Sequence, residues 1–296
     1  MTYDVIVIGG SFAGLSAALQ VARARRHVLV VDSGQPRNRF ADSAHGFFAQ
    51  DGRGPSAILA SARAQLLGYP EVTLVDAAAQ RADRDGDVLV VTLAGGDRFR
   101  GSRLILATGL TDEFPAVPGL EERWGRTVLH CPYCHAYEIE SDRLGVLATG
   151  PASVDLANLV SDWGRVTLFT QRIECDSGGM EKFRARGGRI EDAFVLAVEG
   201  EDAQTVTARL ADGRRVELDA LFIATVLRQT SGLAKQLGCR FVQGPHCEIV
   251  ATDDDKATSV PGVYAAGDMA RISHNATLAS ADGVTAGISA HQSLLA

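Results

Sequence analysis

The sequence predicts an α/β protein built from two Rossmann-like, three-layer ββα domains of the nucleotide-binding type. Residues 4–32 and 144–170 both show a buried strand, a glycine-type loop, a helix and a second strand, and two such starts in one chain indicate two such domains. The length agrees, because 296 residues correspond to about two domains at roughly 100–200 residues each.

The first of these strand–loop–helix–strand segments, residues 4–32, is the better defined of the two. Residues 4–8 read DVIVI, an apolar β-branched run typical of a buried parallel strand. An Ala- and Leu-rich helix is expected over 15–25, followed by a second apolar strand over 27–31 that ends at Asp32. A carboxylate at that point can accept hydrogen bonds from the ribose of an adenine nucleotide.

The loop between the first strand and its helix follows the pattern G-x-G-x-x-G, with Gly9, Ser11 and Gly14 at the three key positions. Such a loop lets pyrophosphate approach the backbone at the N-terminus of a helix, where a partial positive charge lies. Serine at the second position is small enough to admit the phosphate. The other interpretation is a purely structural turn. The predicted contacts to a dinucleotide come from Gly9, Ser11, Phe12, Ala13, Gly14 and Asp32.

The remaining elements follow from apolar runs and turn residues. A loop is expected over 36–54, a helix over 55–67, and strands over 72–78, 88–93 and 104–107. The second start comprises a strand over 144–147, a helix over 154–163 and a strand over 166–170. Later strands over 221–225 and 262–266 precede a closing helix over 278–295.

Composition excludes several classes of protein. The net charge of -7 gives no basic field for nucleic acid or anionic lipid. No run approaches the roughly 20 apolar residues that span a bilayer, and the first residues, MTYD, lack the features of a signal peptide. Five cysteines are too few and too irregular for a secreted disulfide framework. A cytoplasmic protein is therefore expected.

Cys131 and Cys134 form a C-x-x-C motif, HCPYCH. This spacing lets the two sulfurs meet within one helical turn, so that a disulfide can close and reopen, and Pro132 favours a helix start. His135 can move a proton near neutral pH; its other interpretation is a helix cap or a packing residue. A zinc site would need two more ligands, and no metal is expected. Inert structural thiols are the remaining alternative.

In this order, the motifs resemble those of the low-molecular-weight thioredoxin reductase family, over essentially the whole chain. The ordered set is the loop at 9–14, Ala107-Thr108-Gly109, the cysteine pair before a second glycine-type loop, and PGVYAAGD at 261–268. The resemblance implies a homodimer. It also implies a discontinuous FAD-binding domain over 1–112 and 240–296, with an inserted NAD(P)H-type domain over 113–239 that carries the cysteines.

The resemblance assigns roles to individual residues. Cys134 would lie against flavin C4a, and Cys131 would attack the external disulfide. The segment 45–52 falls where the family places residues beside the flavin, although a packed surface loop is the alternative. The further FAD contacts that the resemblance implies are Asp51, Thr108, Gly109, Gly267, Asp268 and Ala281.

The pyridine-nucleotide half departs from the family pattern. Ala148, Gly150 and Ser153 stand at the key positions of the second loop, and Thr170 and Gln171 stand where the family places a 2′-phosphate clamp of His and Arg. Arg172 keeps the third position of that clamp. Whether NADPH or NADH binds is therefore open. The motif Cys-x-x-Cys-His resembles a branch that contains dithiol oxidases and reductases lacking an NADPH motif.

Three functions follow. The first is a disulfide reductase that acts on a thioredoxin-like protein or a small disulfide. The second is a dithiol oxidase that transfers electrons from a small dithiol to oxygen and releases peroxide. The third is a non-enzymatic flavin redox sensor, which would not need a flavin-coupled C-x-x-C. The sequence favours a cysteine–flavin enzyme and leaves the direction of electron flow open.

Overall fold

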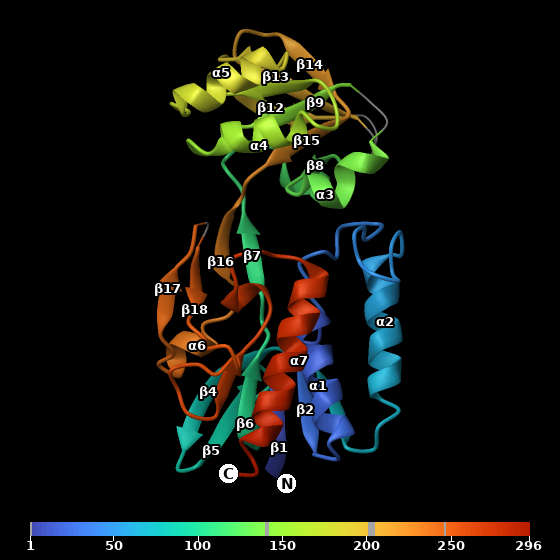
Figure 1. Ribbon diagram of the computed structural model, residues 1–296, viewed down its shortest axis with the longest axis vertical. Coiled ribbons are helices and arrows are strands. Elements are labelled where there is room, and N and C mark those ends of the chain that lie inside the picture. Colours follow the sequence, from blue (N-terminus) through green and yellow to red (C-terminus); the bar gives the residue numbers. More distant parts are fainter. Residues whose placement is uncertain (1, 140–141, 201–204, 246) are drawn as a thin grey trace. The chain divides into compact units, whose positions relative to one another are not determined.

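The computed structural model describes residues 2–139, 142–200, 205–245 and 247–296 (Figure 1). The chain forms two units. The first contains Met1–Arg39, Pro55–Thr111 and Leu227–Ala296, and the second contains Phe40–Gly54 and Asp112–Val226. Among the described residues, no helix is both long enough and apolar enough to cross a bilayer.

The first unit is built on one sheet whose strands run in the order β3-β2-β1-β6-β5-β4. The strands from β3 to β6 are parallel, whereas β5 and β4 continue the sheet antiparallel. A further strand, β19, pairs in parallel with the last residues of β6. The bounds are β1 (Thr2–Ile8), β2 (Val28–Asp32), β3 (Val72–Asp76), β4 (Ala79–Asp85), β5 (Val88–Leu93), β6 (Arg98–Leu106) and β19 (Val263–Ala265).

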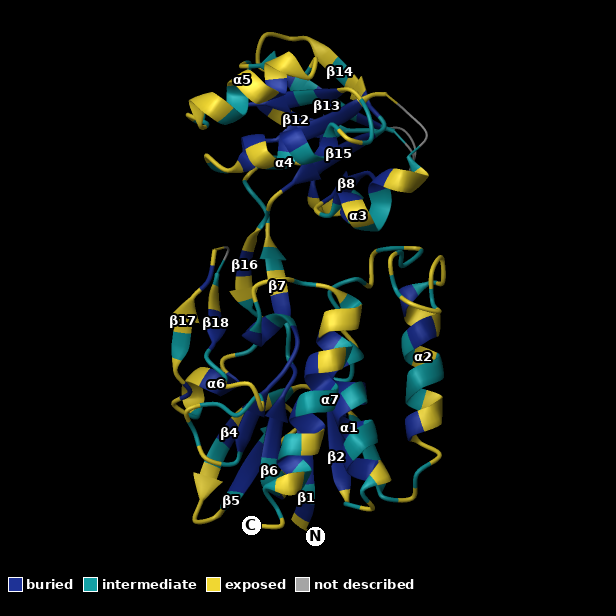
Figure 2. Cartoon of the chain, in the orientation of Figure 1, coloured by how far each residue is buried: buried dark blue, intermediate teal, exposed yellow. Residues whose placement is uncertain are grey.

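Alternating side chains of β1 build two cores on opposite faces of this sheet, as a fully buried strand requires. Val5 and Val7 pack with the helices α1 (Phe12–Arg23) and α7 (Ala276–Gln292). Ile6 and Ile8 pack on the other face, with side chains of β5 and β6 and of the short helix α6 (Leu233–Gln236). The central strands are buried along most of their length (Figure 2).

The remaining elements of the first unit lie outside these cores or at their edge. Helix α2 (Pro55–Leu66) buries Leu66 in the core that α1 shares. The strands β17 (Phe241–Gln243) and β18 (Glu248–Val250) form a separate antiparallel pair. A 3-10 turn, η3 (Asp268–Ala270), follows β19.

The second unit has three layers. A parallel sheet in the order β11-β10-β9-β15-β8 lies between an antiparallel sheet, β12-β13-β14, and the helices α4 (Ser153–Val160) and α5 (Ser177–Ala185). One core joins the two sheets and another joins the parallel sheet to the helices. The strand bounds are β8 (Val128–Leu129), β9 (Leu144–Leu147), β10 (Val166–Phe169), β11 (Arg189–Glu191), β12 (Val195–Glu199), β13 (Val206–Leu210), β14 (Arg215–Leu218) and β15 (Ala220–Ile223).

The second unit contains three further short elements. They are η1 (Glu121–Arg123), α3 (Pro132–His135) and η2 (Ala136–Glu138). The chain passes between the units through the paired strands β7 (Leu110–Glu113) and β16 (Val226–Gln229). The predicted α/β class with two Rossmann-type domains, one inserted in the other, is thus confirmed.

The limits of the units differ from the predicted ranges in two places. Residues 227–239 belong to the first unit, because Leu233 and Ala234 of α6 pack in its core. The segment 40–54 belongs to the second unit. Its Phe40 lies against Gly125, where an added Cβ would come within 2.8 Å of the Phe40 Cβ. Both assignments depend on contacts between residues far apart in the sequence.

Candidate active site and nucleotide-binding loops

The first glycine loop is shaped by close backbone contacts. Gly9 has a φ of +108°, and a Cβ there would lie 2.2 Å from the carbonyl oxygen of Ala107. A Cβ on Gly14 would lie 1.7 Å from the carbonyl oxygen of Gly9. Only glycine fits at either position. Ser11 is the N-cap of α1, yet its side chain makes no capping hydrogen bond. The N-terminus of α1 therefore has no side-chain cap that would compete with a phosphate.

Asp32 lies beside this loop, at the end of β2. Its Oδ1 accepts a hydrogen bond from the Gly34 amide at 3.2 Å, and its Oδ2 lies 3.7 Å from Arg63 Nη1. A Cβ on Gly10 would meet the Asp32 carboxyl group at 2.6 Å. The carboxylate thus borders the first loop closely, at the position from which a ribose could be held.

Three further predicted cofactor residues lie near the same loop or the elements that border it. Gly267 has a φ of +77°, and a Cβ there would lie 2.9 Å from the Cβ of Ala13. Thr108 donates to Met269 Sδ at 3.4 Å. Asp268 forms an ion pair with Arg37, with 3.5 Å between Asp268 Oδ2 and Arg37 Nη1. These close contacts within the protein shape the loop, and the N-terminus of α1, which has no side-chain cap, can hold the pyrophosphate of a dinucleotide such as FAD.

Two further predicted cofactor residues, Gly109 and Ala281, belong to the first unit, whereas a third, Asp51, belongs to the second. Gly109 has a φ of +68°, as a turn after β6 requires. Ala281 lies in α7. Asp51, by contrast, belongs to the second unit, where its Oδ1 accepts a hydrogen bond from the Gly46 amide at 2.8 Å. The structure brings Asp51 together with the cysteine unit; its role as a cofactor residue stays a prediction.

The cysteine pair is a disulfide in the structure, with 5.3 Å between the Cα atoms of Cys131 and Cys134. Cys131 is the N-cap of α3 and Pro132 is its first residue, as the sequence indicated. Both cysteines are partly exposed, whereas Tyr133 between them is largely exposed and meets the edge of Trp163 at 5.4 Å. The disulfide is therefore within reach of an external thiol or disulfide.

His135 follows the second cysteine directly. Burial lowers the pKa of this histidine, while the carboxylate of Glu138 raises it and His45 lowers it further. The net direction is downward, so the imidazole is neutral over a wider pH range than in water and can accept a proton. The sequence indicated the segment 45–52, which begins at His45, and Glu138 after the cysteine motif only through the family resemblance, and it assigned neither residue a role beside His135.

The second glycine loop is occupied by its own side chain. The Ser153 hydroxyl oxygen accepts hydrogen bonds from the amides of Thr149 at 3.0 Å and Gly150 at 3.3 Å. Ala148 is buried, and its amide donates to the Phe169 carbonyl. A nucleotide could use this loop only by displacing the serine hydroxyl.

The clamp positions after β10 are also engaged. Buried Thr170 donates to Asp192 Oδ1 at 2.8 Å and accepts from the Arg172 amide at 3.2 Å. Gln171 forms two hydrogen bonds with the Val195 backbone, at 2.9 and 3.4 Å. The Arg172 guanidinium lies 5.0 Å from the ring centre of Phe194. All three side chains therefore already have partners within the protein.

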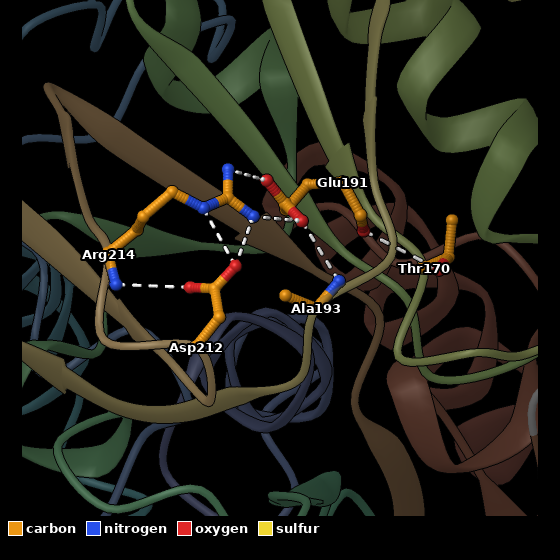
Figure 3. Close-up of polar contacts among 5 residues, drawn as sticks. All are labelled: Thr170, Glu191, Ala193, Asp212 and Arg214. Carbon is orange, nitrogen blue, oxygen red and sulfur yellow. Dashed lines mark hydrogen bonds and ion pairs between the residues drawn. The ribbon is translucent and has the colours of Figure 1, made fainter.

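Thr170 lies beside Glu191, whose carboxylate is paired with Arg214 (Figure 3). Glu191 accepts two hydrogen bonds from Arg214, and these bonds lower the pKa of Glu191. Arg214 also pairs with Asp212. Arg186, at the end of α5, donates to the Asn158 carbonyl and pairs with Asp162. This arrangement favours neither of these arginines as a 2′-phosphate ligand.

The other cysteines do not join the site. Burial raises the pKa of the thiols of Cys175, Cys239 and Cys247, which makes each of them a poor nucleophile near neutral pH. Among the residues that the structure describes, no group of three or more His, Cys, Asp and Glu side chains could hold a metal ion.

Comparison with known proteins defines the family. Residues 3–283 match the pyridine nucleotide-disulphide oxidoreductase family. Thioredoxin reductase tcpT of Claviceps purpurea is 34% identical over 99% of this chain and 94% of its own length. The crystal structure of an oxidoreductase from Agrobacterium tumefaciens is 43% identical with a TM-score of 0.94, covering 100% of this chain and 99% of the other. A crystal structure of the protein HlmI is 36% identical with a TM-score of 0.93, covering 99% and 93%.

The chain therefore belongs to the pyridine nucleotide-disulphide oxidoreductase family, and the resemblance to thioredoxin reductases that the ordered motifs indicated is confirmed. This family implies FAD and, in typical members, NADPH. The described residues fit the first of these groups, since the loop at Gly9 to Gly14 leaves an uncapped helix N-terminus beside Asp32.

Proposed function

We propose that the protein is a FAD-dependent thiol–disulfide oxidoreductase in which the Cys131–Cys134 disulfide exchanges with an external disulfide or dithiol. The observation that carries this proposal is the disulfide itself, partly exposed and directly followed by a half-buried histidine whose pKa is lowered by burial. Family membership supports the same chemistry. We further propose that the protein is a homodimer and that it is located in the cytoplasm.

Gly9, Gly14 and Asp32 would hold the FAD, with its pyrophosphate at the N-terminus of α1. When bound, the flavin supplies the two-electron transfer between the cysteine pair and a second reactant, either NAD(P)H or oxygen. Asp51, Thr108, Gly109, Gly267, Asp268 and Ala281 are proposed as further contacts on the family pattern.

The exchange step is carried by this chain's own residues. His135 accepts the proton of an incoming thiol, and the resulting thiolate attacks Cys131 Sγ. The Sγ–Sγ bond breaks and Cys134 leaves as a thiolate. In the opposite direction the Cys131 thiolate attacks an external disulfide. The same groups therefore serve a reductase of thioredoxin-like proteins or small disulfides and an oxidase of small dithiols.

The second glycine loop favours the dithiol-oxidase direction. The loop amides are bonded to Ser153, and the clamp positions Thr170 and Gln171 are bonded to Asp192 and Val195. Each bond must break before a pyridine nucleotide can take its place. A small dithiol meets no such obstacle at the cysteine pair. In this direction oxygen receives the electrons and leaves as hydrogen peroxide.

Anaerobic titration of the purified protein tests the proposal. NADPH, NADH and dithiothreitol are added separately at equal concentration, and flavin absorbance is followed together with the count of free thiols. We expect rapid reduction by dithiothreitol and slow reduction by both nucleotides. Fast reduction by NADPH alone would instead support the reductase direction. Failure of every reductant to reduce the pair would contradict an enzymatic role and favour a redox sensor.

A further inference from the structure

The segment 40–54 forms a closed loop that brings a histidine into the cysteine unit. Ala44 and Arg53 form a backbone bridge, and the Gly52 amide donates to the Ala44 carbonyl at 2.9 Å. His45, on this loop, has a side chain only 17% exposed. Its Nε2 lies 3.0 Å from the Ser43 hydroxyl oxygen. The ring is therefore fixed on one side by its own loop.

The other ring nitrogen of His45 faces two carboxylates. His45 Nδ1 lies 3.3 Å from Glu138 Oε1 and 3.8 Å from Asp51 Oδ1. Glu138 ends η2, directly after the helix that carries His135. The charges of Glu138 and His45 are also the two that act on His135. Glu138 thus contacts His45 directly and, from the turn that follows α3, also acts on His135 through its charge.

We propose that His45 and Glu138 are positioning residues that set the protonation of His135 during thiol–disulfide exchange at Cys131–Cys134. This inference rests on the proposed function, because thiol–disulfide exchange is the reaction in which His135 would accept and return a proton. His45 and Glu138 do not touch the sulfur atoms. They act through His135, as an imidazole and a carboxylate in contact with each other.

The step balances without a further reactant. An external thiol loses its proton to neutral His135, the new thiolate forms a mixed disulfide with Cys131, and Cys134 is released as a thiolate. The positive charge on His135 is stabilised by the carboxylate of Glu138, which His45 also contacts. When Cys134 later takes up a proton, His135 returns to its neutral form.

The two positioning residues have opposite expected effects. Removing the carboxylate with Glu138→Gln takes away the interaction that raises the pKa of His135, so that the pKa falls. Removing the ring with His45→Gln takes away an interaction that lowers it and frees Glu138 to act more strongly, so that the pKa rises. Exchange needs neutral His135. At about pH 5.5, exchange should therefore be faster in Glu138→Gln and slower in His45→Gln, by on the order of threefold each.

The test uses the purified holoprotein with dithiothreitol as the probe. Thiols formed at Cys131 and Cys134 are trapped by alkylation after timed exposure across a range of pH and are counted by mass spectrometry. The ionisation of dithiothreitol is common to all variants and cancels in the ratio of rates. The C2 proton of His135, followed by NMR, reports its protonation independently of turnover. Glu138→Asp keeps the charge and should restore most of the wild-type profile.

Matched controls are Glu181→Gln, at an exposed position of α5, and His291→Gln, in α7 of the other unit. Opposite shifts in Glu138→Gln and His45→Gln, with unchanged controls, support the inference. Equal slowing of both variants at every pH would assign these residues a purely structural role. Wild-type profiles in both would refute the inference while leaving the proposed function intact. The proposed function fails separately if dithiothreitol does not reduce the wild-type pair.

Discussion

Replacing Thr170 by His and Gln171 by Arg should create a preference for NADPH where the natural protein has little. The natural side chains are bonded to Asp192 and to the Val195 backbone. Each of the two neutral hydrogen bonds to the Val195 backbone contributes about 0.5–1.5 kcal/mol and the one to the Asp192 carboxylate about 1.5–3 kcal/mol, so that removing all three costs about 2.5–6 kcal/mol of folding free energy. A charge-assisted hydrogen bond to the 2′-phosphate contributes about 1.5–3 kcal/mol, and about 1.4 kcal/mol is tenfold in affinity. A single such bond therefore favours NADPH over NADH by roughly tenfold to a hundredfold.

Isothermal titration of each nucleotide into both proteins measures this ratio, and thermal unfolding measures the loss of stability. Gln80→Arg, an exposed substitution in the other unit, adds the same charge and serves as the control. We expect a ratio near one for the natural protein and for the control. Strong binding of NADPH by the natural protein, about tenfold tighter than NADH, would refute the view that this site has lost its phosphate clamp.

Three further predictions concern the cofactor, the cysteines and the packing. The protein should release FAD on heating, as chromatography of the supernatant will show; FMN would contradict the dinucleotide site. The natural protein and the control Cys175→Ser should develop a long-wavelength thiolate–flavin absorbance on two-electron reduction, Cys131→Ser should show it already with its flavin oxidised, and Cys134→Ser should lack it in every state. Gly283→Ala should lower the unfolding free energy by about 1–3 kcal/mol, because its Cβ would lie 2.0 Å from a carbonyl oxygen of α1. Gly150→Ala has open space and should change it little.

The parallel strands could be predicted from the sequence because they are buried on both faces. Continuous apolar runs of this kind correspond to β1 and β2 in the first unit and to β9 and β10 in the second. The helices α2 and α7 also match, with ends that differ from the expected ones by a few residues. The sequence pattern was sufficient to predict a strand or helix wherever buried residues recur at regular intervals along the chain.

Other elements lacked such a pattern. Helix α5 begins Ser177-Gly178-Gly179, a poor helical sequence, and it is fixed by the Asp176 cap and by the contact of Gly179 with Val154. The antiparallel strands β12, β13 and β14 were not singled out either, since their burial depends on the neighbouring sheet. Contacts with other elements stabilise both helix α5 and this antiparallel sheet, so neither could be predicted from the local sequence.

The residues of the candidate site also differ in whether the sequence alone reveals them. Cys131, Cys134 and His135 are adjacent in sequence, so a motif was enough to find them. His45 comes from a segment more than eighty residues away, and only the fold shows that it pairs with Glu138. The engagement of Thr170 by Asp192 is equally invisible in the sequence. Residue type indicated a weakened clamp there, but the partners that hold the side chains of Thr170 and Gln171 are brought to them only by the fold.

The serines of the two glycine loops lead to a last prediction. Ser11 makes no capping hydrogen bond, whereas Ser153 binds the amides of Thr149 and Gly150. A pyrophosphate in the second loop must displace this hydroxyl, which forfeits two hydrogen bonds of about 1 kcal/mol each. Ser153→Gly removes that competition. Because NADPH and NADH share the pyrophosphate, the variant should bind both more tightly by a similar factor, on the order of tenfold, with no new preference between them. Isothermal titration of both nucleotides measures this, with Ser161→Gly at the end of α4 as the control. A gain confined to NADPH would place the obstacle at the 2′-phosphate alone, and no gain would mean that buried Ala148, rather than Ser153, closes the loop.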